Sequence, residues 1–118
     1  MEKVFSFQQA LLAGYDPENY KYGKDLLLGE FNVTLNFKIW AKGFTPAVTC
    51  FCSINGNGDL IRFNVFRNKE GDYYLKDSNI DMVKLLYGAE FSILVARNSK
   101  GNIVVTGIKL EKTVKLST

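Results

Sequence analysis

A strict alternation of apolar and polar side chains between Phe31 and Trp40 is the feature that most constrains the fold of this chain. Successive side chains of a β-strand point to opposite faces, so period two over ten residues predicts a strand with one face in the core. We expect Lys38, Trp40 and Lys42 to point outward together. The residues expected to point inward are Phe31, Val33, Leu35, Phe37 and Ile39.

Four more strands are predicted after this one, each bounded by turn residues. Their ranges are 47–55, 60–68, 90–97 and 102–113. The turn at 55–59 reads Asn-Gly-Asn-Gly-Asp, and it is a strong hairpin signal because Asn and Gly tolerate positive φ. Short turns of this kind favour antiparallel neighbours.

The spacing of apolar residues changes between the third and fourth predicted strands. Ile80, Val83 and Leu86 share one face of a helix that Asp77 or Ser78 could cap, and Gly88 would end it. Residues 1–30 are predicted to form an N-terminal arm or a short helix, for which 7–12 is the candidate. The predicted fold class is therefore mainly β, with a five-stranded domain over 31–118 and one helix between strands 3 and 4.

Composition argues for binding over catalysis. The 118 residues fit one domain, and they contain no histidine, which is the usual general base and the commonest metal ligand. We therefore expect no enzyme activity, no metal site and no cofactor. Cys50 and Cys52 are too far apart on a strand for a relaxed disulfide, so they are predicted to be free, buried thiols in a reducing compartment. The N-terminus does not read as a signal peptide, and no apolar run is long enough to span a membrane.

The predicted element order resembles the OB-fold, a small Greek-key barrel that binds oligonucleotides through its strand 2–3 face and adjoining loops. The stretches FNVTLNFKIW, AVTCFCSING, LIRFNVFRN, NIDMVKLL and AEFSILVARNSKGNIVVTGIKLEK fall where a single-stranded-DNA-binding protein of the bacteriophage type has its five strands and its helix. The resemblance covers residues 31–113. It implies a cytoplasmic homo-oligomer that binds single-stranded DNA, or RNA, during replication or recombination and that contacts other proteins of those processes. The ending KLEKTVKLST is basic, unlike the acidic tail of bacterial members, so recruitment of partners through a tail is not expected.

The outward faces of the first three strands form the predicted binding surface. Aromatic rings stack on bases with little regard to sequence, and cations neutralise phosphates. The net charge of +3 is compatible with such a partner but decides little by itself. Lys100, at the tip of the last hairpin, is an additional candidate. The candidate nucleic-acid-binding residues are Lys38, Trp40, Lys42, Phe51, Arg62, Phe66 and Lys100.

Alternative interpretations remain open for several of these side chains. Trp40 and Phe51 could instead pack under the N-terminal arm or at a subunit interface, where aromatic residues are also enriched. The pair Tyr73-Tyr74 fits packing and stacking equally well, and Arg67 and Arg97 are expected to be solvated. No role is assigned to Tyr15, Tyr20 and Tyr22. The alternative function is a protein-interaction module without catalysis, such as a virion component or an inhibitor of a host protein.

Overall fold

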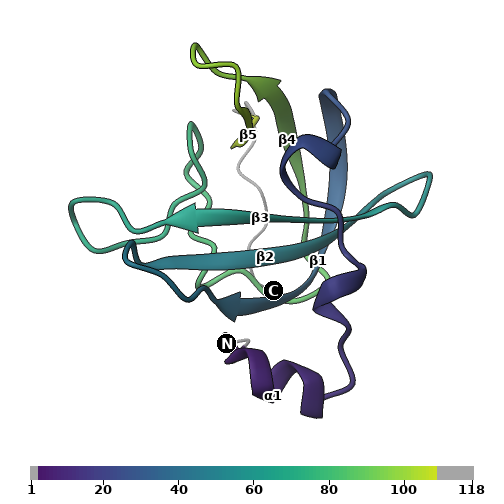
Figure 1. Cartoon of the computed structure of the whole chain (residues 1–118), viewed down its shortest axis with the longest axis vertical. Helices are drawn as coiled ribbons and strands as arrows, with labels where there is room; N and C mark the ends of the chain where they lie inside the picture. The colour runs from purple at the N-terminus through teal and green to yellow at the C-terminus, as the bar shows by residue number, and fades with distance from the viewer. Residues whose placement is uncertain (1–2, 109–118) are drawn as a thin grey trace.

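The computed structural model describes residues 3–108, which form a mainly β domain around one five-stranded antiparallel sheet (Figure 1). The strand order in the sheet is β3-β2-β1-β4-β5. Among the described residues β3 and β5 do not pair with each other, so the sheet is not closed into a barrel. The strands are β1 (Gly29–Trp40), β2 (Ala47–Ile54), β3 (Leu60–Phe66), β4 (Glu90–Arg97) and β5 (Ile103–Gly107).

All five predicted strands are present close to their expected positions. The alternation along β1 and the glycine-containing turns set these positions, because both are local signals. The fifth strand ends at Gly107, and the predicted continuation over 109–113 lies outside the described residues.

A bulge in β1 changes which side chains face the core. Leu35 lies opposite Cys52 and Phe37 lies opposite Phe51, so Asn36 has no partner residue on β2. One extra residue in a strand reverses the alternation beyond it. The side chain of Asn36 stabilises the bulge through two hydrogen bonds. Its Nδ2 atom donates to the hydroxyl groups of Tyr20 at 3.1 Å and Ser53 at 2.7 Å.

The bulge gives the sheet an apolar cluster on each face. The main core, on the inner face, includes Val33 and Leu35 of β1 together with Cys50, Cys52 and Phe63. The N-terminal cluster, on the outer face, consists of Ala10, Phe37, Ile39 and Phe51. The prediction of one inward face from Phe31 to Ile39 is therefore wrong beyond Leu35. The outward orientation predicted for Lys38 is wrong for the same reason, because Lys38 lies opposite Cys50 and is fully buried.

Residues 3–28 pack on the outer face and along two strand edges. The short helix α1 (Phe7–Leu12) begins at Ser6, whose side chain accepts from the backbone of Gln9 in a capping box. Phe5 pairs with Ile39 and Lys21 pairs with Ile61, which adds one bridge to β1 and one to β3. Two 3₁₀ turns, Pro17–Asn19 and Gly23–Asp25, complete this N-terminal segment. A short helix at 7–12 is thus confirmed.

The helix predicted to begin at Asp77 or Ser78 and end at Leu86 is absent, and this prediction is wrong. The backbone instead folds back on itself, with Leu75 donating to Ile80 at 3.0 Å and Met82 donating to Tyr73 at 2.9 Å. Asp77 has φ 61°, whereas a residue that caps a helix typically has extended backbone. The Ser78 hydroxyl donates to Leu75 and accepts from Ile80, and this turn chemistry competes with helix formation. Packing decides the outcome, because Ile80, Met82 and Leu85 are the side chains buried in the main core.

Candidate functional site

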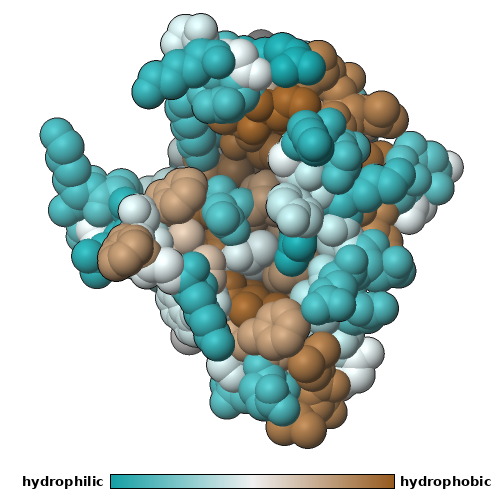
Figure 2. Space-filling view, in the orientation of Figure 1, coloured by the Kyte–Doolittle hydropathy of each residue, from teal (hydrophilic) through white to brown (hydrophobic). Residues whose placement is uncertain are grey.

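A groove of about 990 Å³ follows β3 and continues around its edge. Its lining includes Arg62, Asn64 and Phe66 from the outer face of β3, and the turn residues 74–76 and the β5 residues 103–105 from beyond the edge. Figure 2 shows hydrophobic side chains within a hollow beneath the β4–β5 hairpin, with hydrophilic side chains around it. The groove thus lies where the sheet stays open between β3 and β5.

Five exposed aromatic rings and three cations line this groove. The rings belong to Phe7, Tyr22, Trp40, Phe66 and Tyr74, whose exposed fractions are 37%, 58%, 42%, 54% and 44%. The cations are Lys42, Arg62 and Lys76, and none of the described residues that line the groove carries a carboxylate. The lining therefore combines stacking surfaces with positive charge and has no acidic group to oppose an anion.

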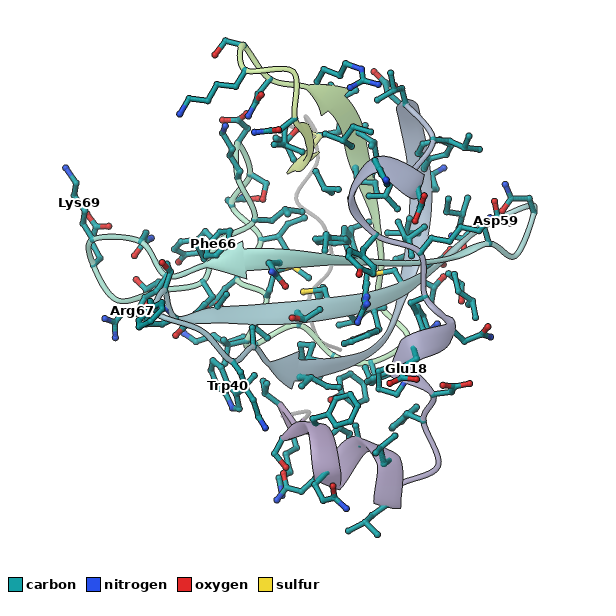
Figure 3. The ribbon with its side chains drawn as sticks, in the orientation of Figure 1. Glu18, Trp40, Asp59, Phe66, Arg67 and Lys69 are labelled. Atoms are coloured by element: carbon teal, nitrogen blue, oxygen red, sulfur yellow. The ribbon has the colours of Figure 1, made fainter. Side chains whose placement is uncertain are left out.

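Strand direction brings Trp40 and Phe66 to the same end of the sheet. Both β1 and β3 run antiparallel to β2, so their last residues, Trp40 and Phe66, lie at the same end. Figure 3 shows these two residues at one end with Arg67 and Lys69, whereas Asp59 and Glu18 lie toward the other end. Two basic side chains, Arg67 and Lys69, thus lie at the same end of the sheet as Trp40 and Phe66.

The prediction that Trp40 shares a sheet face with Phe51 and Phe66 is wrong. The bulge places it opposite Val48, on the inner face, where its ring meets Tyr73 edge-on at 5.3 Å. It still reaches the groove because it lies at the strand end. Tyr73 therefore packs, while its neighbour Tyr74 lines the groove.

Arg62 and Tyr22 form a stacked pair beside β3. The Cζ atom of Arg62 lies 4.1 Å from the centre of the Tyr22 ring. The Nε atom of Arg62 is buried and has no hydrogen-bond acceptor among the described residues. This donor is the one polar side-chain atom in the described part of the chain that is both buried and unpaired.

The groove lining includes five of the predicted contacts, namely Trp40, Lys42, Phe51, Arg62 and Phe66. Lys38 is not among them. Its Nζ atom donates to the backbone carbonyls of Val83 and Leu85, each at 2.8 Å, so this ammonium group is a structural element of the interior.

Phe51 borders the groove but offers no open ring for a base. It is 2% exposed and stacks on Phe37 with ring centres 4.3 Å apart, while Tyr20 meets it edge-on at 5.2 Å. The alternative interpretation of Phe51, packing under the N-terminal arm, is the one that the structure confirms.

The remaining predicted residues lie outside the groove. Lys100 is exposed in the β4–β5 turn and is not among the lining residues. Arg97 donates to the carbonyl of Gly101 at 2.9 Å, and Arg67 is exposed. The solvated character expected of both arginines agrees with these positions.

Tyr22, Tyr74 and Lys76 are aromatic or charged lining residues that were not predicted as site residues. Each comes from a segment without regular strand or helix structure, so no periodicity places its side chain. The sequence offered only a compositional signal for these residues. In two turn segments a tyrosine lies next to or near a lysine, as in Lys21-Tyr22 and Tyr74-Leu75-Lys76.

The two thiols are free and buried, as predicted. Burial raises the pKa of Cys50 to about 12, although the charge of Lys38 lowers it in part. Burial and the neighbouring Cys50 also raise the pKa of Cys52. Both thiols are therefore protonated at neutral pH and are unsuited to act as nucleophiles or metal ligands.

In the described part of the chain no group of three or more Cys, Asp or Glu side chains is placed to hold a metal ion. Residues 3–108 also contain no helix that is long and apolar enough to cross a membrane.

Comparison of the chain with protein-family models, with curated proteins and with solved structures finds no match.

Proposed function

We propose that this protein binds single-stranded nucleic acid in the groove beside β3, without sequence preference and without catalysing a reaction. The observation that carries the proposal is the lining of the groove, in which five exposed aromatic rings accompany three cations and no described lining residue is acidic. Unpaired bases stack on aromatic rings, whereas a duplex hides its base faces. Positive charge along the same groove favours the phosphate backbone.

We further propose that the sheet is of the Greek-key OB type. In support, β1 pairs with both β2 and β4, and the β3 side of the sheet carries the groove. The resemblance to phage single-stranded-DNA-binding proteins extends the proposal to DNA as the ligand, to protection of unpaired strands during replication or recombination, and to a homo-oligomer in the host cytoplasm.

Titration with oligo-dT while the fluorescence of Trp40 is followed tests this function. Trp40 is the single tryptophan and lines the groove, so stacking of bases nearby should quench its emission. The effect should weaken as salt rises, because binding releases counterions. Absence of both quenching and a gel shift at low salt would contradict the proposal.

A matched variant separates binding from folding. Trp40→Ala should weaken binding of oligo-dT roughly fivefold or more while the chain remains folded, because the side chain lies at a strand end and is partly exposed. Phe44→Ala is the control, since Phe44 is fully exposed and lies outside the groove lining. Unfolding of Trp40→Ala would mean that this ring is a core residue.

One observation favours a second candidate, a protein-interaction module. β3 is an edge strand, and the single bridge from Lys21 covers the part of it near Ile61. An exposed edge can accept an extended peptide as an added strand. Binding of an extended peptide, with no effect of oligo-dT on Trp40, would favour this candidate.

A further inference from the structure

We propose that Tyr22 and Arg62 form a subsite for one nucleotide, in which a phosphate draws the guanidinium off the Tyr22 ring and the uncovered ring stacks on the adjacent base. The inference rests on the proposed function and adds to it a binding site within the N-terminal segment. That segment, to which the sequence assigned no ligand role, becomes one wall of the groove.

Backbone pairing fixes the two side chains next to each other. Lys21 donates to the carbonyl of Leu60 at 3.0 Å, and Arg62 donates to the carbonyl of Lys21 at 2.8 Å. Tyr22 follows directly and precedes the 3₁₀ turn Gly23–Asp25. The ring and the guanidinium are therefore held side by side by main-chain bonds, whether or not they are stacked.

In the stacked arrangement one N–H group of Arg62 lacks a hydrogen-bond acceptor. Its Nε–H group is buried and has no acceptor among the residues described. A cation–π contact with a ring that is more than half exposed is weak, and a buried guanidinium N–H without a partner costs more than such a contact returns. A ligand that accepts hydrogen bonds from the N–H groups of Arg62 should therefore displace the guanidinium from the Tyr22 ring.

A phosphate group is a better hydrogen-bond acceptor for the Arg62 guanidinium than any described neighbour. Arginine presents N–H donors in a planar fork that matches two phosphate oxygens. No carboxylate among the described lining residues competes for the guanidinium. Once Arg62 turns toward the phosphate, the face of the Tyr22 ring that the guanidinium covers is open to a base.

Along β3 the subsite is separate from the ring of Phe66. Phe66 lies four residues from Arg62 on the same face of β3, which corresponds to about 13 Å along the strand. Asn64 lies between them and lines the groove. A base on Phe66 therefore belongs to a different nucleotide from the base on Tyr22.

Affinity for oligo-dT, measured over a range of salt concentrations, tests the subsite with paired variants. Tyr22→Ala should bind roughly tenfold more weakly with an unchanged salt slope, whereas Tyr22→Phe, which keeps the ring, should bind like the unmodified protein. Arg62→Ala should lower the affinity and also make the salt slope shallower by about 0.7. Lys69→Ala and Phe44→Ala are the matched controls, since neither residue lines the groove.

An oligomer of abasic sites separates the two contributions of the ligand. It keeps the phosphates and lacks the bases, so Arg62→Ala should weaken its binding while Tyr22→Ala should not. Equal losses for both variants on the abasic oligomer would overturn the division of roles.

Nitrogen-15 NMR of the unmodified protein tests, without any variant, whether the Arg62 guanidinium leaves the Tyr22 ring when the ligand binds. The Arg62 Nε–H signal should exchange slowly with water in the free protein and shift when oligo-dT saturates the groove. An unchanged signal at saturation would overturn the subsite even if the variants fold poorly.

The outcomes distinguish failure of the subsite from failure of the proposed function. If the unmodified protein does not bind oligo-dT, the proposed function fails and the subsite fails with it. If the unmodified protein binds and the Tyr22 and Arg62 variants bind equally well, the subsite alone is overturned. A lower Tm of those variants would then identify the pair as a structural contact of the N-terminal segment.

Discussion

Lys38 and Lys42 lie four positions apart in the sequence, yet their ammonium groups have opposite surroundings. Lys38 is fully buried, donates to two backbone carbonyls and lies 5.5 Å from the centre of the Tyr87 ring. Lys42 is exposed and lines the groove. The first therefore belongs to the stability of the fold and the second to its surface chemistry.

Substitution of the two lysines should give opposite results. Lys38→Ala should lower the free energy of unfolding by roughly 3 kcal/mol, because it leaves a cavity and two carbonyls without their donor. Lys42→Ala should change it by less than about 0.5 kcal/mol but weaken binding of oligo-dT. Urea denaturation measures the first effect and a fluorescence titration the second. Equal stability of the two variants would contradict the interior role of Lys38.

The buried thiols predict a loss of stability at high pH. Cys50 has an ordinary pKa of 9.0 when unfolded and about 12 in the fold. Between these values the unfolded chain releases a proton that the folded protein keeps, so unfolding becomes easier as pH rises. The stabilisation is complete below pH 9.0 and is lost through about pH 12.

Urea denaturation at about pH 8 and about pH 11 should show this decline, by roughly 1 kcal/mol per pH unit. The double variant Cys50→Ala/Cys52→Ala should lose part of the pH dependence. An identical decline in that variant would assign the effect to other groups.

At the scale of elements, the N-terminal segment and the β1 bulge depend on each other. The bulge turns Phe37 and Ile39 to the outer face, and the N-terminal segment covers them with Ala10 and Tyr15. Tyr15 stacks on Phe37 with ring centres 4.2 Å apart. The segment is therefore part of the folded domain, although the sequence suggested a boundary at residue 30.

Loss of the Tyr15 ring should destabilise the whole domain. Tyr15→Ala should lower the free energy of unfolding by roughly 2–3 kcal/mol, because it removes a ring that packs on the N-terminal cluster. Leu12→Ala is the control, since Leu12 is 81% exposed. Single-step unfolding in urea, followed by circular dichroism, would show that the segment and the sheet unfold together. A Tyr15→Ala variant as stable as Leu12→Ala would indicate an independent arm.

At the scale of the whole molecule, the distribution of charge matters more than the net charge of +3. Lys42, Arg62 and Lys76 come from three separate parts of the chain and meet at one groove. Charges gathered in this way act together on a polyanion.

The salt dependence of binding should report these three cations. Three phosphate contacts on a single strand predict that log K falls with log salt with a slope of about −2. Lys76→Ala should make the slope shallower by about 0.7, while Arg97→Ala, outside the groove, should leave it unchanged. A slope near zero in the unmodified protein would contradict binding through phosphates.

The positions of the strands and the burial of the two free cysteines follow from the sequence without any tertiary information. Alternation and glycine-containing turns are local patterns, so they survive without knowledge of the neighbours. The outward orientation of Arg62 and Phe66 was predictable because the alternation holds along β3, whereas Trp40 and Lys42 reach the groove from the end of β1 and from just beyond it.

Three features depend on packing between distant segments, namely the bulge at Asn36, the irregular path from Asp77 to Leu86 and the place of Tyr22 beside Arg62. The physical reason is that both faces of the end of β1 are buried, one by the main core and one by the N-terminal segment. An apolar residue in this part of β1 can therefore be buried on either face. For this reason the alternation from Phe31 to Ile39 does not reveal that side chains beyond Leu35 change face. Lys38 is turned inward by this reversal, and its ammonium group finds acceptors there because residues 83–85 are not helical.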